Sequence, residues 1–305
     1  MSGNIDLKVN IGGLELKNPV IAASGCFGFG REYSRFFDLN SLGGIAVKGL
    51  TLQPRKGNPP PRIAETPSGI LNSIGLQNPG VQAFIEKEIP FLRGFDTKII
   101  ANASGSTVEE YEKMVEILSD ADIDAIELNL SCPNVKEGCL SFGSSPHGVR
   151  EVVSRVKKYA KKPLIVKLSP NVTDIAEIAK AAEEAGADSV SLINTILGMA
   201  IDARTRRPVL GNITGGLSGP AIKPIALRMV YEVSKAVKIP VIGMGGITNG
   251  TDAVEFLLAG ATAVMVGSAG FANPMAWVET IEGIEAYMAN NSVNSVTELI
   301  GGLIV

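Results

Sequence analysis

The feature that most constrains the fold is a recurring alternation of short apolar runs and helical stretches. Eight runs rich in Val and Ile recur along the 305 residues, and amphipathic stretches separate most of them. Such continuous runs are typical of strands that are buried on both faces of a parallel sheet. The pattern predicts a (β/α)8 TIM barrel, with a doubly wound sheet as the alternative. The expected strands cover residues 20–23, 44–47, 99–103, 125–130, 164–168, 189–193, 241–244 and 263–266.

Three segments depart from this alternation. Residues 6–9 and 13–16 surround two glycines and predict a short amino-terminal β-hairpin. Residues 51–77 are rich in Pro and Gly, and residues 196–220 are polar and turn-rich. Both long insertions follow the carboxyl ends of expected strands, where barrel enzymes place their sites. Because no linker or low-complexity run interrupts the chain, we expect residues 1–305 to form a single domain.

Composition narrows the classes of function. The net charge of −3 argues against a nucleic-acid partner, and no apolar run approaches the roughly 20 residues that span a bilayer. Residues 1–10 are polar and do not resemble a signal peptide or a membrane anchor. Three cysteines make no disulfide framework, so we expect a cytoplasmic protein. The single histidine, His147, which we expect on the surface near a helix start, argues against histidine metal centres and Ser-His-Asp chemistry.

Polar side chains or glycines follow all eight expected strands. One asparagine or glycine alone would be read as a turn residue, and one lysine as a solvated side chain. A barrel needs no such ring for stability, so the set predicts one polar pocket at the carboxyl ends of the strands. In chain order the ring contains Ser24-Gly25, Lys48-Gly49, Asn102, Asn129 with Cys132 and Asn134, Lys167, Asn194-Thr195, Gly245-Gly246 and Gly267-Ser268.

The glycine clusters late in the chain predict a phosphate site. Residues 243–246 and 267–269 follow the last two expected strands, and residues 215–219 precede them. Loops at these places in barrels often bind phosphate through backbone N–H groups, and glycine lets the backbone approach the oxygens closely. A phosphate-bearing cofactor is therefore favoured.

Two kinds of side chain in the ring suggest the chemistry. Lys167 ends an expected strand, where a lysine needs an anionic partner. A reduced flavin would serve, as would an Asp or Glu in a salt bridge, and Lys48 has the same two readings. Cys132 follows a strand end, between two asparagines and before Pro133, and this setting favours a reactive thiol over a buried structural one. We expect Cys26 to be structural and Cys139 to lie in the same loop as Cys132 without forming a redox pair.

These motifs together resemble the class 1 dihydroorotate dehydrogenases, FMN-dependent barrels of pyrimidine (UMP) biosynthesis. The resemblance covers almost the whole chain. The motifs that carry it are Asn-Leu-Ser-Cys-Pro-Asn at 129–134, Val-Lys-Leu-Ser-Pro-Asn at 166–171, Ile-Asn-Thr at 193–195, Gly-Gly-Leu-Ser-Gly-Pro at 215–220, Gly-Met-Gly-Gly at 243–246 and the substrate loop Asn-Ser-Ile-Gly-Leu at 72–76.

The resemblance implies a role for each of these residues. Cys132 would be the base that removes the C5 proton of dihydroorotate, while FMN N5 takes the C6 hydride. The substrate would be held by Lys48, Asn72, Ser73, Ile74, Gly75, Leu76, Asn129, Asn134, Asn194 and Thr195. FMN would be contacted by Ser24, Lys48, Gly49, Asn102, Asn129, Lys167, Ile193, Gly219, Gly245, Gly246, Gly267 and Ser268. No metal site is implied.

Within the class, the motifs Ser-Pro-Asn-Val-Thr at 169–173 and Asn-Thr-Ile-Leu-Gly at 194–198 most resemble the NAD-linked type B catalytic subunit. That resemblance implies a partner subunit carrying FAD and a [2Fe-2S] cluster, in a heterotetramer built on a homodimer. Three cysteines cannot supply both a four-cysteine cluster and a base, so this chain would bind neither group. The membrane-associating extension and serine base of class 2 are not expected here.

Other readings remain open. The homodimeric, fumarate-linked type A enzyme and the dihydropyrimidine dehydrogenase subunit share much of this pattern. An RNA-modifying dihydrouridine synthase has a comparable Asn-x-x-Cys-Pro segment, although the net charge of −3 counts against RNA. A barrel that only binds or assembles would leave the ring of polar strand ends without a purpose.

Overall fold

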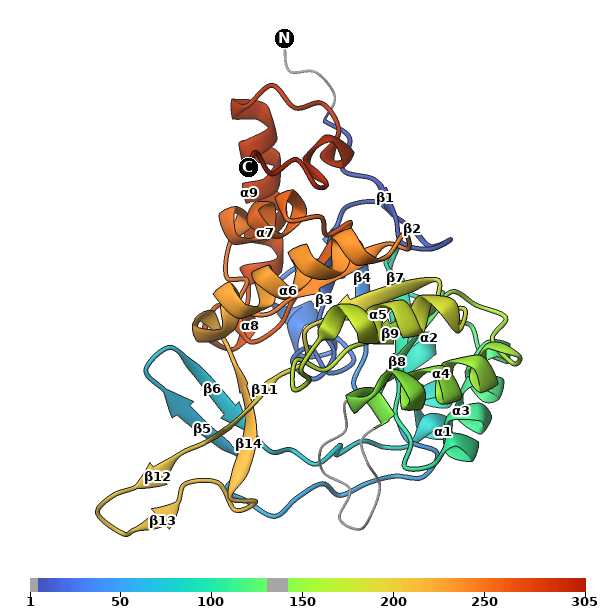
Figure 1. The fold of residues 1–305 in the computed structure, drawn as a ribbon, viewed down its shortest axis with the longest axis vertical. Helices are drawn as coiled ribbons and strands as arrows, with labels where there is room; N and C mark the ends of the chain where they lie inside the picture. Colours follow the sequence, from blue (N-terminus) through green and yellow to red (C-terminus); the bar gives the residue numbers. More distant parts are fainter. Residues whose placement is uncertain (1–4, 131–141) are drawn as a thin grey trace.

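The computed structural model describes residues 5–130 and 142–305 and shows a closed ring of eight parallel strands. The ring runs in the order β10-β15-β16-β3-β4-β7-β8-β9, and β9 pairs with β10 to close it. Figure 1 labels β3, β4, β7, β8 and β9 in the middle of the fold. This confirms the predicted barrel and rules out the doubly wound sheet. The ring strands are β3 (Val20–Ala22), β4 (Gly44–Ala46), β7 (Lys98–Ala103), β8 (Ala125–Asn129), β9 (Leu164–Lys167), β10 (Ser189–Leu192), β15 (Val241–Met244) and β16 (Ala263–Val266).

Six longer helices follow ring strands and bury one face each. Side-chain caps explain several of their starts: Thr107 accepts a hydrogen bond from the Glu110 amide, and Asp174 accepts from the amides of Ala176 and Glu177. Their apolar stripes join the core that surrounds the strands. The helices are α3 (Val108–Asp120), α4 (Pro146–Lys157), α5 (Ile175–Glu184), α6 (Lys223–Ala236), α7 (Gly250–Leu258) and α9 (Ala276–Asn290).

Short elements complete the chain. The amino-terminal hairpin is confirmed, although its strands are brief: β1 (Val9–Asn10) pairs antiparallel with β2 (Glu15–Leu16). The short helices are η1 (Tyr33–Arg35), η2 (Leu39–Ser41), α1 (Val81–Ala83), the π-helical η3 (Phe84–Glu88), α2 (Ile89–Leu92), η4 (Phe142–Ser144), η5 (Pro220–Ile222), α8 (Ala269–Ala272) and η6 (Val296–Leu299). No helix within the described ranges is both long and apolar enough to cross a bilayer.

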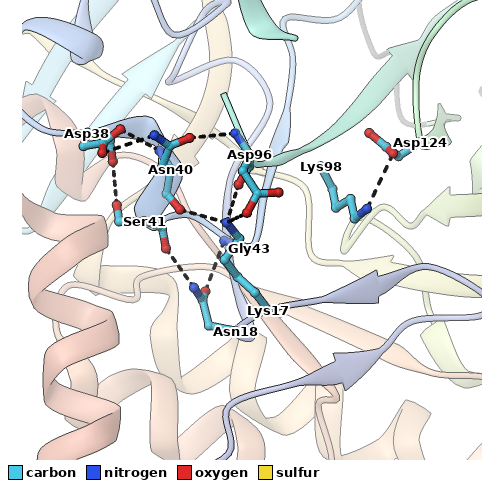
Figure 2. Close-up of polar contacts among 9 residues, drawn as sticks. All are labelled: Lys17, Asn18, Asp38, Asn40, Ser41, Gly43, Asp96, Lys98 and Asp124. Carbon is cyan, nitrogen blue, oxygen red and sulfur yellow. Dashed lines mark hydrogen bonds and ion pairs between the residues drawn. The ribbon is translucent and has the colours of Figure 1, made fainter. Parts of the chain in front are cut away.

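Side chains tie together the amino ends of neighbouring ring strands (Figure 2). Just before β3, the Asn18 side chain accepts hydrogen bonds from the Val20 and Gly43 amides and donates to the Ser41 carbonyl oxygen. Beside it, Lys17 forms a 2.6 Å ion pair with Asp96, which precedes β7. These contacts stabilise the amino-terminal end of the barrel and leave the opposite end for a site.

The two long insertions form one antiparallel sheet in the order β11-β14-β6-β5. The sequence pattern assigned no strands to these insertions, whereas the structure forms β5 (Ile63–Thr66), β6 (Gly69–Asn72), β11 (Ile196–Met199) and β14 (Thr214–Ser218) within them. The pair β6–β14 joins the insertions, with Leu217 opposite Leu71. Beyond this sheet lies a small hairpin of β12 (Ile201–Asp202) and β13 (Arg207–Pro208). The four-stranded sheet and the hairpin project from the barrel on the side away from α9 (Figure 1).

Candidate active site

A cavity opens at the carboxyl ends of the ring strands, as the polar strand ends predicted. Its wall comes from β9, β10, β15, β16 and the connections that follow them, together with the segment after β3. The residues singled out from the sequence that line it are Ser24, Lys167, Ile193, Asn194, Thr195, Gly219, Gly245, Gly246, Gly267 and Ser268. The arrangement brings one lysine, several hydroxyls, one side-chain amide and four glycines around one concave space.

The glycines of the wall allow a close approach that larger residues would block. Gly219, Gly245 and Gly246 have φ values of 101°, 125° and 78°, in the left-handed region that disfavours other residues. A Cβ on Gly246 would lie 2.9 Å from the Gly219 carbonyl oxygen and 2.8 Å from the Cβ of Lys223. The loops after β14 and β15 are therefore packed backbone against backbone at the rim of the cavity.

An ion-pair network behind these loops was not anticipated from the sequence. Lys223, at the start of α6, pairs with Asp252 Oδ1 at 2.6 Å and with Glu255 Oε2 at 2.8 Å, both on α7. The second oxygen of Asp252 accepts from the amide and hydroxyl of Thr248. Burial favours a higher pKa for Asp252, but the hydrogen bonds from Lys223 and Thr248 outweigh it and hold that pKa below its usual value. The network joins the helices on either side of β15.

A buried polar layer lies inside the barrel next to the cavity. Glu127 on β8 is fully buried and accepts hydrogen bonds from Asn102 Nδ2 at 2.5 Å and Ser191 Oγ at 2.7 Å. Lys167 Nζ lies 3.8 Å from Glu127 Oε2. The salt-bridge reading of Lys167 is thus correct, and the same lysine also lines the cavity.

Two predicted substrate asparagines meet at the ends of β8 and β10. Asn194 Nδ2 donates to Asn129 Oδ1 at 3.4 Å, and Asn194 Oδ1 accepts from the Thr195 amide at 2.7 Å. The Tyr111 hydroxyl donates to the Asn129 carbonyl oxygen at 2.7 Å. Both amides are thereby held in place by their neighbours before any ligand arrives.

The predicted substrate loop, residues 72–76, begins at the end of β6 in the inserted sheet. Asn72 Nδ2 donates to the Gly216 carbonyl oxygen at 3.3 Å, and a Cβ on Gly216 would lie 2.0 Å from Thr195 Oγ1. Ser73 is buried, and Gly75 and Leu76 both have positive φ. The loop does not line the cavity, and this holds for Ser73, Ile74, Gly75 and Leu76 as well as Asn72. Gly216 lies between Asn72 and Thr195, and so connects the loop to the cavity wall.

Lys48 and Gly49, after β4, also lie outside the cavity lining, while Cys26 lies within it. Burial lowers the pKa of Lys48, and the nearby Cys26 partly offsets that change. Burial raises the pKa of the Cys26 thiol to about 11, although the charges of Lys167 and Lys48 act in the opposite direction. We expected a purely structural role for Cys26, and its place in the cavity wall could not be read from an isolated Cys in a Gly-rich segment.

Several predicted residues lie outside the described ranges or away from the cavity. Cys132, Asn134 and Cys139 fall in residues 131–141, so their predicted roles stay predictions. His147 is exposed in the first turn of α4, as expected. Within the described part of the chain, no group of three His, Cys, Asp or Glu residues could hold a metal ion.

Comparison with known proteins identifies the family. The family model for dihydroorotate dehydrogenase matches residues 6–288. The chain belongs to the dihydroorotate dehydrogenase family. Among its relatives are two proteins named dihydroorotate dehydrogenase B (NAD(+)), catalytic subunit: one from Alkaliphilus metalliredigens, 61% identical over 98% of this chain and 99% of the relative, and one from Bacteroides thetaiotaomicron, 59% identical over the same shares.

A solved structure supports the fold of this family member. The crystal structure of DHODH in complex with ferulenol from Eimeria tenella superimposes with a TM-score of 0.80, covering 97% of this chain and 88% of that one. At 22% identity this likeness concerns the fold alone. Membership of a family of flavin-dependent oxidoreductases confirms the class expected from the motifs, and the names of the relatives agree with the predicted type B.

Proposed function

We propose that this chain oxidises dihydroorotate to orotate with FMN, as the catalytic subunit of an NAD-linked enzyme of pyrimidine biosynthesis. The observation that carries the proposal is the cavity at the strand ends, whose wall combines a glycine-rich rim, a buried lysine and Asn194, which donates to Asn129 behind it. The names of the relatives, which cover 98% of the chain, support the substrate and the acceptor.

The residues present fit FMN. Gly219, Gly245, Gly246, Gly267 and Ser268 would surround its phosphate with backbone N–H groups. At Gly219, Gly245 and Gly246 a Cβ would come within 2.8 Å of a neighbouring atom. Lys167 would face the flavin ring system, with Ser24, Lys48, Gly49, Asn102, Asn129 and Ile193 around it. Asn102 Oδ1 is buried without a hydrogen-bond partner among the described residues, as expected of an acceptor that awaits a ligand N–H. When bound, FMN supplies the two-electron acceptor of the reaction.

The chain's own side chains would hold the substrate and move a proton. Asn72, Asn129, Asn134 and Asn194 offer the donors and acceptors that a pyrimidine ring and carboxylate require, with Thr195, Lys48 and residues 73–76 beside them. Cys132 would take the C5 proton as the general base. A thiol with an ordinary pKa of about 8.5 needs local tuning for this role near neutral pH.

A partner subunit would carry the electrons onward. The relatives are named catalytic subunits, and in this proposal the partner holds FAD and a [2Fe-2S] cluster in a heterotetramer built on a homodimer of this chain. FMN is then the cofactor of residues 1–305, which we infer to be one domain. A fumarate-linked type A enzyme is the competing assignment.

An anaerobic titration tests the proposal. The purified chain, reconstituted with FMN, should show a flavin spectrum that dihydroorotate bleaches, whereas dihydrouracil should leave it unchanged. Cys132→Ala should retain FMN and lose most of this reduction near pH 7. Steady-state oxidation of dihydroorotate should be supported by NAD only when the partner subunit is added. A fumarate-supported rate without the partner would assign type A, and bleaching by dihydrouracil alone would overturn the substrate.

A further inference from the structure

Glu127 is an acidic residue in the interior of the barrel that the proposed reaction does not use. Its position on β8 pairs in register with Asn102 on β7 and with Ile165 on β9. The residue has no exposed surface. An acidic side chain in such a place costs stability unless it is paired, and an apolar residue of similar size would serve the core as well.

Both carboxylate oxygens of Glu127 are engaged. Oε1 accepts from Ser191 Oγ at 2.7 Å, and Oε2 accepts from Asn102 Nδ2 at 2.5 Å and lies 3.8 Å from Lys167 Nζ. The partners come from β7, β9 and β10, so this carboxylate connects four ring strands, its own β8 included. Its negative charge lies next to the buried lysine of the cavity wall.

The same contacts decide how the Asn102 amide is turned. Because a carboxylate only accepts hydrogen bonds, the NH2 group of Asn102 must face Glu127 and the carbonyl oxygen must face away. That oxygen lies 3.0 Å from the point where a Cβ on Gly49 would stand, and it is buried without a partner within the described ranges. The orientation leaves an acceptor, and not a donor, on the side of the predicted flavin residues.

We propose that Glu127 is a positioning residue that fixes the flavin-facing side of Asn102 and partly offsets the positive charge of Lys167. The carboxylate thereby sets how readily bound FMN accepts electrons. A reduced flavin is anionic, so an uncompensated lysine beside it would favour reduction. The negative charge of Glu127 makes reduction of the flavin less favourable. The inference rests on the proposed function, since it concerns the same cofactor.

Glu127→Gln isolates the charge from the hydrogen bonds. A Gln side chain can still accept from Asn102 and can donate to Ser191 Oγ, but it carries no charge. We expect the variant to bind reduced FMN about tenfold more tightly relative to oxidised FMN than the unchanged protein does. For a two-electron couple, this ratio corresponds to a midpoint potential about 30 mV more positive. The measurement is a spectroelectrochemical titration of the FMN-bound chain.

Ser191→Ala is the matched control, because it removes one neutral hydrogen bond to the same carboxylate and keeps the charge. Its potential should stay near that of the unchanged protein. A Glu127→Gln potential equal to that of the control would overturn the charge role. If neither the unchanged protein nor the variants bind FMN, the proposed function fails instead, so the two failures are distinguishable.

A second variant tests the orientation of Asn102 and remains informative if Glu127→Gln does not fold. Asn102→Ser removes both the donor to Glu127 and the outward acceptor while the charges of Glu127 and Lys167 remain. Weaker binding of FMN by about tenfold, measured by quenching of FMN fluorescence, is expected from the loss of one buried hydrogen bond. Equal affinity would overturn the orienting role of Glu127.

Discussion

The side-chain amides of Asn129 and Asn194 meet at 3.4 Å, with Nδ2 of Asn194 donating to Oδ1 of Asn129. Asn129 ends β8 and Asn194 lies two residues after β10, and these two strands flank β9 in the ring. Each residue is fixed further by Tyr111 or Thr195. Two of the proposed substrate contacts therefore form one unit, in which each asparagine is held by the other and by a further neighbour.

This contact predicts coupled effects on substrate binding. Asn129→Ala and Asn194→Ala should each raise the KM for dihydroorotate by tenfold or more. The double variant should cost less than the sum of the two, because either single change already releases the other amide. A double-mutant cycle on kcat/KM measures the coupling. Strict additivity would show that the amides act independently, and the exposed Asn291→Ala serves as the control.

Gly216 should be intolerant of a methyl group. An added Cβ would stand 2.0 Å from Thr195 Oγ1, so Gly216→Ala must displace Thr195 or the strand β14. We expect a rise of at least tenfold in the KM for dihydroorotate with FMN still bound. Gly198→Ala, on the paired strand β11, meets the flexible end of Leu71 at 3.1 Å and the Cβ of Leu217 at an ordinary 3.8 Å, and should change KM little. Equal behaviour of the two variants would remove Gly216 from the site.

Asp252→Asn should destabilise the protein by about 2 kcal/mol near pH 7, because it leaves Lys223 and Thr248 with a weaker partner. The pKa of Asp252 lies below its ordinary value in the folded chain, so its contribution is present above about pH 3.8 and is lost as the pH falls through the folded pKa. Urea unfolding at several pH values should show the difference between variant and unchanged protein shrinking in acid.

The control for this change lies on α6, the helix that begins with Lys223. Arg228 pairs with Glu232 on the exposed face of α6, and Arg228→Ala should cost only about 0.3–0.5 kcal/mol. FMN affinity should fall in Asp252→Asn and stay constant in Arg228→Ala. The reason is that Asp252 contacts the loop at the cavity rim through Thr248, whereas the Arg228–Glu232 pair does not. A pH-independent loss in Asp252→Asn would place the effect in packing and not in the charge.

The Cys26 thiol should be slow to react at neutral pH. Its pKa is raised to about 11 by burial, so the thiolate fraction at pH 8 is small and grows about tenfold for each pH unit up to that value. Alkylation by iodoacetamide, followed by peptide mass spectrometry, reports each cysteine separately. Bound FMN should slow the labelling further, because Cys26 lines the cavity. Rapid labelling at pH 7 would contradict the burial of the thiol.

The barrel could be predicted because its signal is local. Most ring strands are short runs rich in Val, Ile, Leu and Ala, and caps such as Thr107 and Asp174 begin the helices that follow. The polar strand ends also converge by necessity, since parallel strands in a closed ring point their carboxyl ends the same way. Knowing the strands was enough to gather Lys167, Asn194 and the glycines around one space.

The inserted sheet could not be predicted in the same way. Strand β14 contains Gly215 and Gly216, residues that weaken a strand signal, and its partner Asn72 lies 144 residues earlier in the chain. The roles of Glu127 and Asp252 depend on contacts across strands and helices that no local pattern reports. An acidic residue inside an apolar run indicates only that something must neutralise it, and the structure supplies Asn102, Ser191 and Lys167.

The inserted sheet also connects two opposite points of the ring. Its β5–β6 part leaves after β4 and its β11–β14 part leaves after β10, and three ring strands separate β4 from β10 in either direction. One arc, β7 to β9, carries Asn129 and leads into the segment with Cys132; the other, β15, β16 and β3, carries the glycine loops. The proposed proton transfer and the glycine loops after β15 and β16 thus occupy separate arcs, while Asn194, Thr195 and Gly219 come from the connection after β10 that divides them. Changes near the proposed base therefore leave most of the proposed phosphate anchoring untouched.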